Sequence, residues 1–329
     1  FFDVTANRDL LEDSRMLGAH LKRKKLNVVA LTPWVDYDNF NLLTGKPTER
    51  AEYKELMIGA MAAFKAVDPE IQCIGCMEGN IVSLSPGAQE ALYDVLPADL
   101  RKQGVRSFTD RQMELSETLD LGWRDCLLTA FNGRYSYELY YRGEKRDFPM
   151  MAVLVYAAPG NGQMKYWLDQ ARFLMEDVGL DGVYVDQFSL AFSATPDYSD
   201  PTRVSQRYSY EKWDGVTVDM DPATGRIIRR YTDGAWVGAG ARKALVEYVL
   251  SQGGTVVANT HCAVEELQSD SVIRVSEAEW VFDPLALVPG EEPPVHFRMC
   301  KGQLDSPVAL GFRPQRLGEE GPRHYAEAS

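Results

Sequence analysis

The sequence has few of the residues from which metal and redox sites are built. It contains five cysteines and four histidines among 329 residues. The cysteines are too scattered for a disulfide framework, and their odd number leaves at least one thiol free. The histidines form no HxH or HExxH cluster, which metal-dependent hydrolases need. Cys73 and Cys76 form a CxxC, but it lies inside a strand-like run, where the two side chains face opposite sides. We therefore expect no metal and no cofactor.

Positive charge is in deficit. The chain has 35 Lys and Arg against 48 Asp and Glu, a net charge of −13 and a sequence pI near 4.9. The negative electrostatic potential of such a chain repels phosphate backbones and anionic lipid, so we expect no nucleic-acid partner. The dense basic run Lys22–Lys25 follows a helical pattern and is expected at a solvated helix end.

Long apolar runs are missing as well. No run approaches the roughly 20 residues of a membrane span, and the first residues carry no signal-peptide pattern, so we expect a soluble chain with no membrane partner. The compartment stays open, with an extracellular or periplasmic location slightly favoured. The motifs GxGxxG, GxxxxGK[ST] and GxSxG are all absent, which counts against nucleotide-binding folds and serine hydrolases.

What is present is an alternation of strand-like runs with helical periodicity, which is typical of a parallel α/β protein. Eight strands are predicted, at residues 1–5, 27–34, 71–78, 150–157, 182–186, 255–260, 271–279 and 308–312. Eight strands at this length predict a (β/α)₈ TIM barrel, built as a single domain over residues 1–329. A doubly wound open sheet is the alternative, but it would usually carry a Gly-rich ligand turn after an early strand.

Two connections are far longer than usual and predict insertions at about 79–149 and 188–254. Both follow predicted strands, so in a barrel both would wall a cleft at the C-terminal face. The second connection contains a predicted hairpin, Val216–Met220 and Arg226–Tyr231, around the turn Asp221–Gly225.

Strand alternation then points to candidate catalytic carboxylates. Asp186 ends the run GVYVD on the face that also carries Tyr184, opposite Val183 and Val185. Glu277 and Glu279 share one face at the end of the run SVIRVSEAE, with Glu277 expected level with Asp186. One predicted strand separates the two, so the carboxylates could converge over the mouth of a barrel. Asn259 and His261 end that intervening strand on a shared face and could donate hydrogen bonds.

The other strand ends repeat this chemistry. They carry acids alternating with aromatics, namely Trp34, Asp36, Glu78, Tyr156, Tyr184 and Trp280. Sugar rings stack their C–H faces on aromatics and bind carboxylates and amides through their hydroxyls. Glycosidic cleavage needs one protonated and one ionised carboxyl group. The alternatives are that Asp186 is a structural carboxylate holding a loop, and that the aromatics belong to the core.

Residues 166–188 add a resemblance. The stretch from Tyr166-Trp167-Leu168 to Gly179-Leu180-Asp181-Gly182-Val183-Tyr184-Val185-Asp186 resembles a helix-then-strand segment of barrel glycoside hydrolases, similar to the retaining α-galactosidase and α-glucosidase superfamily. The resemblance implies that Asp186 is the nucleophile and Glu277 or Glu279 the acid/base. The chain departs from that group at Tyr184, where a Lys is usual, and in having Glu where the acid/base is typically Asp.

The sequence therefore predicts a glycoside hydrolase that acts on a poly- or oligosaccharide, with a retaining mechanism implied by the resemblance. Two alternatives stay open. One is a carbohydrate-binding barrel without catalysis. The other is a polysaccharide lyase, for which Arg274 and His261 are the nearby candidates; alternation points Arg274 away from the glutamates.

Overall fold

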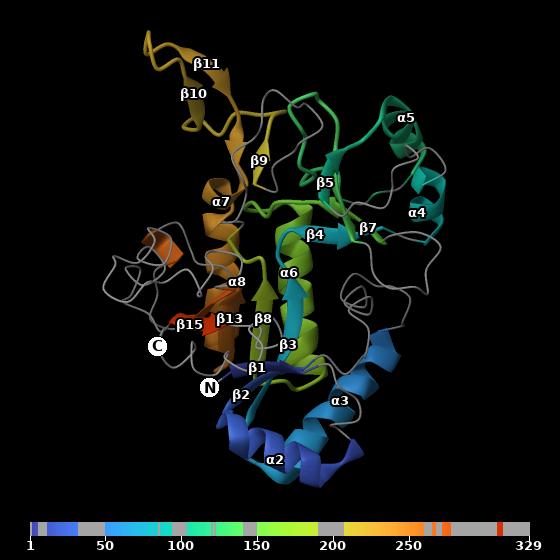
Figure 1. The fold of residues 1–329 in the computed structure, drawn as a ribbon, viewed down its shortest axis with the longest axis vertical. Coiled ribbons are helices and arrows are strands. Elements are labelled where there is room, and N and C mark those ends of the chain that lie inside the picture. The colour runs from blue at the N-terminus through green and yellow to red at the C-terminus, as the bar shows by residue number, and fades with distance from the viewer. Residues whose placement is uncertain are drawn as a thin grey trace, which may run out of the picture.

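The computed structural model describes residues 2–5, 12–31, 50–84, 86–93, 104–119, 121, 123–140, 150–189, 207–259, 265–267, 272–277 and 308–311. At its centre lies a parallel sheet of seven strands in the order β1-β2-β3-β8-β13-β14-β15 (Figure 1). The strands are β1 (Phe2–Thr5), β2 (Val28–Leu31), β3 (Gln72–Glu78), β8 (Gly182–Asp186), β13 (Thr255–Asn259), β14 (Val272–Glu277) and β15 (Val308–Gly311). The order in the sheet follows the order in the chain, as it does in a barrel.

The sheet does not close, so the predicted (β/α)₈ TIM barrel is wrong. β1 and β15 are the two edges, and no pairing within the described residues joins them. The five inner strands, β2 to β14, form a curled half-barrel instead. Seven of the eight predicted strands are found in this sheet, so the prediction fails at the remaining one.

That strand is the predicted run 150–157. The structure places it as β7 (Met150–Leu154) in a separate antiparallel sheet of four strands, in the order β4-β7-β6-β5. The other members are β4 (Ile81–Ser83), β5 (Gly104–Ser107) and β6 (Ser136–Tyr140). Met151 and Val153 pack in one apolar cluster, whereas Ala152 and Leu154 pack in another. Because both faces are covered, the run is apolar throughout and looks like a parallel strand in the sequence.

Helices pack against the parallel sheet and form one large core with it. They are α2 (Ser14–Lys24), α3 (Arg50–Val67), α6 (Gly162–Arg172), its π-helical continuation η2 (Phe173–Asp177), and α8 (Ala239–Ser251). Phe64, Trp167 and Leu245 from three of these helices share a cluster with Val183 and Val185 of β8. α6 and α8 lie side by side against the sheet (Figure 1).

Helix ends follow the local sequence. The Asn161 side chain accepts a hydrogen bond from Met164 N at 3.0 Å and caps α6. The basic run ends α2, as predicted, with Lys25 in a left-handed conformation at φ 51°. The antiparallel sheet is accompanied by α4 (Pro86–Tyr93) and α5 (Asp110–Thr118), the latter with a capping box between Thr109 and Gln112. No helix in the described ranges combines the length and apolar character that a bilayer crossing requires.

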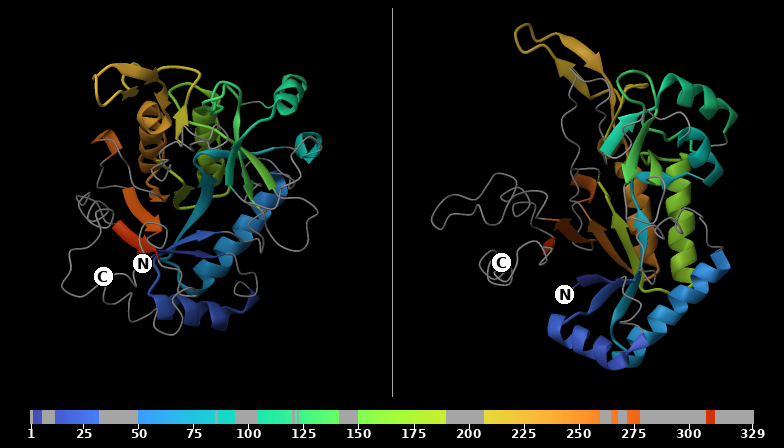
Figure 2. Two further views of the ribbon diagram at one scale, coloured as in Figure 1. Left: turned by 45° about the horizontal axis from the view of Figure 1, so that its top comes forward. Right: turned by 45° about the vertical axis from the view of Figure 1, so that its right-hand side comes forward.

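The predicted hairpin is confirmed, as β10 (Val218–Met220) paired with β11 (Ile227–Arg230). Asp221 organises its turn by accepting hydrogen bonds from Ala223 N and the Thr224 hydroxyl, and Gly225 adopts φ +66°. Figure 2 shows the hairpin extending away from the rest of the chain. At its base lie β9 (Tyr208–Ser209), β12 (Thr232–Asp233) and α7 (Gly234–Val237), and η3 (Glu265–Leu267) precedes β14.

Candidate functional site

Polar residues end four consecutive strands of the parallel sheet. β3 ends at Glu78, β8 at Asp186, β13 at Asn259 and β14 at Glu277. Because the strands are parallel, these ends meet at one edge of the sheet. In open α/β sheets, ligands bind outside the carboxyl ends of the strands, so this edge is the candidate site.

Asp186 is the most constrained of these groups. Its side chain is buried, and its Oδ1 atom accepts three hydrogen bonds. The donors are Asn259 Nδ2 at 2.5 Å, Gln187 N at 3.0 Å and the Tyr184 hydroxyl at 3.3 Å. Donors of this kind favour the ionised form of a carboxyl group. All three engage the same oxygen, which fixes the orientation of the carboxylate.

The backbone immediately after Asp186 is unusual. Gln187 adopts φ +50°, a left-handed conformation that is uncommon for a residue with a side chain. The turn brings Gln187 N to Asp186 Oδ1, and the next residue, Phe188, donates its N–H to Asn259 O at 2.8 Å. Backbone strain of this kind is often found at functional sites, where contacts with the surrounding structure hold the residue in the unfavourable conformation.

Glu78 lies beside Asp186 on the neighbouring strand. The two residues are register partners in the β3–β8 pair, and both are buried, at 4% and 9% exposure. The next residue, Gly79, donates its N–H to Asp186 O at 2.8 Å. A Cβ at Gly79 would lie 2.5 Å from Asp186 O and 2.6 Å from Gln187 O, so the two strand ends can approach this closely only because position 79 is glycine.

Behind this pair lie neutral groups. Burial raises the pKa of the Cys76 thiol well above its usual value, and the charges of Asp186 and Glu78 raise it further. Burial also raises the pKa of Tyr53 on α3 and of Tyr166 on α6. The Cys73 pKa rises to about 12, chiefly through burial. Both thiols of the CxxC are therefore protonated at neutral pH and unreactive.

Glu277 does not lie level with Asp186 along the direction of the strands. Val185 pairs with Ala258, and Ala258 pairs with Arg274. Asp186 lies one residue beyond Val185, whereas Glu277 lies three residues beyond Arg274. Glu277 is thus two residues farther along its strand, a displacement of about 7 Å. The expectation that the two residues are level was wrong.

The other predicted site residues fall into three groups. Tyr184 and Asn259 contact Asp186 directly. Tyr156 is placed elsewhere, in a buried apolar cluster of the antiparallel sheet, where burial above all raises its pKa to about 12. The remainder lie outside the described residues, as does the side chain of Glu277; they are Trp34, Asp36, His261, Glu279 and Trp280.

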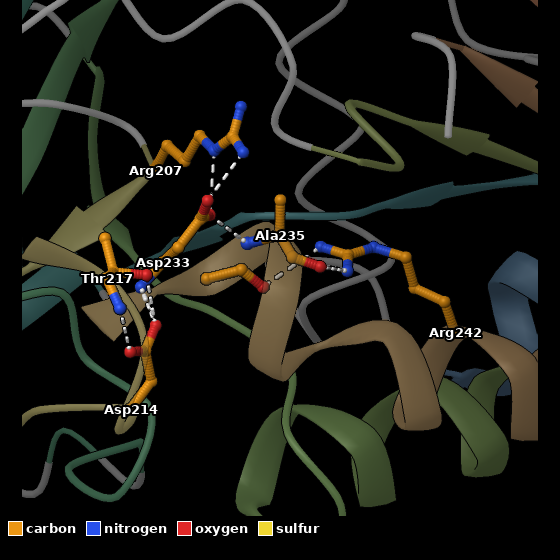
Figure 3. Close-up of polar contacts among 7 residues, drawn as sticks. Arg207, Asp214, Thr217, Asp233, Ala235 and Arg242 are labelled. Atoms are coloured by element: carbon orange, nitrogen blue, oxygen red, sulfur yellow. Dashed lines mark hydrogen bonds and ion pairs between the residues drawn. The ribbon is translucent and has the colours of Figure 1, made fainter. Parts of the chain in front are cut away.

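Sequence reasoning missed Arg242, which fastens the turn after Asp186 from behind. Arg242 is a fully buried residue of α8, and its Nε donates to Phe188 O. Its Nη1 donates to Ala235 O at 2.8 Å in α7 (Figure 3). An arginine within an otherwise apolar helix face was the only signal in the sequence. Arg242 thereby ties α7 and α8 to the segment that holds the candidate carboxylate.

The start of α7 is held by a second polar cluster that the sequence did not reveal. Arg207 binds Asp233 in a bidentate pair, with Nε to Oδ1 at 2.7 Å and Nη2 to Oδ2 at 2.5 Å (Figure 3). Asp233 Oδ1 also accepts from Ala235 N and caps the helix. Burial favours a higher pKa for Asp214, but hydrogen bonds from Asp233 N and Thr217 outweigh it and lower that pKa. These contacts have the features of a structural clamp.

Comparison with known proteins adds little. No protein-family model and no curated protein matches the chain. Among solved structures, it has a weak likeness to a Paenibacillus sp. cycloisomaltooligosaccharide glucanotransferase complexed with cycloisomaltoheptaose, at a TM-score of 0.46 and 9% sequence identity. The match covers 95% of this chain and 38% of that chain.

Proposed function

We propose that the protein is a glycoside hydrolase that cleaves bonds of a poly- or oligosaccharide at the C-terminal edge of its parallel sheet. Asp186 is the nucleophile, and Glu277 or Glu279 is the acid/base. The observation that carries the proposal is the carboxylate of Asp186, held at a strand end by three donors on one oxygen. A carboxylate oriented in this way is prepared for attack.

The carboxylate of Asp186 is assigned the attack on the anomeric carbon. Asn259, Gln187 and Tyr184 hold its Oδ1 atom in place. As the new C–O bond forms, the glycosidic C–O bond breaks, and the acid/base delivers its proton to the leaving oxygen. The same group then takes a proton from water, whose oxygen displaces Asp186 from the sugar and restores its carboxylate.

The spacing of the strands is compatible with such a pair. Positions 186 and 277 are two strands and two residues apart, which gives a Cα separation of about 12 Å on a flat sheet and less on a curled one. If the two side chains extend toward each other from Cα atoms at that distance, their carboxyl groups can lie about 5 to 9.5 Å apart, which covers the separations found in retaining and inverting enzymes.

A polysaccharide lyase is less well supported. It would need groups that neutralise a uronate and take its proton, and Arg274 and His261 were the candidates, of which His261 lies outside the described residues. Arg274 is buried, and its Nη2 donates to Leu267 O at 2.9 Å. Arg274 also lies level with Val185 and Ala258 in the sheet. Because Val185 and Asp186 are successive residues of one strand, Arg274 projects to the opposite face of the sheet from Asp186.

A glycan panel with a reducing-end assay tests the proposal. We expect hydrolysis by the wild type and loss of at least about 10²-fold in turnover for Asp186→Asn, with unchanged far-UV circular dichroism. Asp181→Asn is the matched control, because it removes a carboxylate from the other end of the same strand. Anomeric NMR of the first product tests retention. Glycan binding without turnover in the wild type would favour a non-catalytic carbohydrate-binding protein, and unchanged turnover in Asp186→Asn would overturn the assignment.

A further inference from the structure

One large aromatic side chain on the short helix α7 lies open to solvent. Trp236 is 48% exposed, whereas Ala235 before it is buried and Val237 after it packs against the apolar cluster that contains Tyr156. A single exposed apolar side chain is ordinary on a protein surface, so the position of Trp236 and the way its backbone is held decide what it can do.

Polar contacts hold α7 from two sides. At its start, Asp233 Oδ1 accepts a hydrogen bond from Ala235 N at 2.9 Å, and Arg207 binds the same carboxylate through two hydrogen bonds (Figure 3). From α8, Arg242 Nη1 donates to Ala235 O at 2.8 Å. Both backbone polar groups of Ala235 are therefore bound, and they fix the backbone on which Trp236 follows.

The same arginine joins α7 to the segment that follows the candidate nucleophile. Arg242 Nε donates to Phe188 O, two residues after Asp186, while its Nη1 donates to Ala235 O, the carbonyl directly before Trp236. Because both donors belong to one rigid guanidinium group, the two carbonyl oxygens lie within about 8 Å of each other. The backbone of Trp236 is therefore no farther from Asp186 than a short oligosaccharide can span.

α7 also lies at the edge of the sheet that carries the candidate site. The helix that follows it, α8, ends at Ser251, close to the start of β13, where Thr255 pairs with Gly182 at the opposite edge. α8 has 13 residues, so it is about 20 Å long and returns along the whole length of the strands. Its start, and α7 directly before it, are therefore at the C-terminal edge of the sheet (Figure 1).

We propose that Trp236 forms an aromatic subsite for the glycan that binds at Asp186, where a neutral hexopyranose ring stacks its C–H face on the indole. The inference rests on the proposed function, because it assigns a further contact to the same substrate. Trp213 near the hairpin is a useful contrast, since it is 47% exposed but Arg230 covers its ring at 4.9 Å. Within the described ranges, no guanidinium group or aromatic ring stacks on Trp236 in this way.

The first test measures binding without turnover. Maltohexaose, cellohexaose and mannohexaose are titrated separately into Asp186→Asn, with tryptophan fluorescence and calorimetry as readouts. We expect at least one of them to bind and to change the fluorescence. Adding Trp236→Ala should remove the fluorescence change and weaken binding by about 5-fold or more, whereas Trp236→Phe, which keeps a ring, should retain most of the affinity. Trp213→Ala is the matched control and should bind like its parent.

Two results of these titrations would overturn the subsite. One is that none of the three oligosaccharides binds. The other is that the affinity is the same with and without the Trp236 side chain. Light scattering on the same proteins examines the alternative that Trp236 contacts a second copy of the chain. Dissociation of a wild-type dimer by Trp236→Ala, with glycan affinity unchanged, would overturn the subsite in favour of that contact.

Kinetics on a glycan that the wild type hydrolyses give the second test and separate the two proposals. Trp236→Ala should raise KM about 5-fold or more and leave kcat within a few-fold, because a ring away from the reacting bond binds ground state and transition state alike. A fall in kcat at unchanged KM would overturn the subsite. Binding that depends on Trp236 without hydrolysis of any glycan would retain the subsite and reject the glycosidase. Hydrolysis with equal KM for wild type and Trp236→Ala would do the reverse.

Discussion

The two ends of β8 carry aspartates in opposite settings. Just before the strand, Asp181 Oδ2 accepts hydrogen bonds from Lys65 Nζ and from Cys73 N, both at 2.8 Å. Lys65 also donates to Ile71 O at 3.0 Å, so a cation joins α3 to two strands. At the other end, Asp186 lies beside a second acid, Glu78, and the donors that the described residues supply to its Oδ1 atom are neutral.

The difference separates a structural acid from a candidate catalytic one. A cation that balances a carboxylate lowers its energy but also makes it a poor nucleophile or base. Neutral donors orient a carboxylate and leave its charge available. We therefore expect changes at the Asp181 end to affect stability, and changes at the Asp186 end to affect activity.

The largest expected effect is at the Asp186 end. Asp186→Asn should lower turnover by at least about 10²-fold because it removes the attacking oxygen, while Asn retains the shape of the side chain. The melting temperature should change little or rise, since one buried charge next to Glu78 disappears. Turnover and thermal melts on the same preparation check this. Unfolding without selective loss of activity would make Asp186 a structural residue.

Gly79→Ala should damage both properties. The added Cβ would meet Asp186 O and Gln187 O at 2.5 and 2.6 Å, so the ends of β3 and β8 must separate. We expect a loss of about 1–3 kcal/mol in unfolding free energy together with reduced turnover. Gly59→Ala in α3 is the matched control. Its Cβ would meet nothing within 4 Å, and it should stabilise by about 0.5–1 kcal/mol. Equal denaturant midpoints for the two variants would contradict the close approach.

Asp181→Asn should have a smaller effect, confined to stability. The substitution removes the ion pair with Lys65. The side chains of Lys65 and Asp181 are 34% and 33% exposed, so solvent screens the interaction. We expect a loss of about 1 kcal/mol by urea unfolding, with turnover per folded molecule unchanged. A variant that keeps its stability but loses turnover would reverse the roles of the two ends.

The smallest effect is a pH dependence at the same end. The hydrogen bond to Asp181 is the main reason that the pKa of Lys65 is raised. Because the pKa of Lys65 is higher in the folded state, the Lys65–Asp181 pair makes its full contribution to the unfolding free energy below the unfolded-state pKa of about 10.4. This contribution is lost as pH rises through the folded-state pKa. The stability advantage of wild type over Lys65→Met should therefore be constant near neutral pH and shrink above about pH 10.4. A constant difference in alkaline urea melts would argue against the pair.

Much of the fold is local and could be predicted. The alternation in GVYVD predicted that Val183 and Val185 lie on the face opposite Asp186, and both valines pack in the core that the sheet shares with the helices. The helix over residues 239–251 and the hairpin around Asp221 follow from periodicity and turn chemistry. These features depend on neighbouring residues only.

The partners of β8 depend on distant residues and could not be predicted. The run 150–157 was expected as the strand between β3 and β8, which would have kept Glu78 two strands from Asp186. Its placement in the antiparallel sheet makes β3 and β8 neighbours and brings the two acids together. The register that displaces Glu277 is likewise set by pairing between strands. The hydrophobic periodicity of a single strand carries no information about that pairing.

The most direct test is a paired measurement of turnover for Asp181→Asn and Asp186→Asn, each normalised to its folded fraction, on a glycan that the wild type hydrolyses. We expect wild-type turnover for Asp181→Asn and at least about 10²-fold less for Asp186→Asn. Equal turnover of the two variants would contradict the claim that the chemistry resides at the C-terminal end of β8.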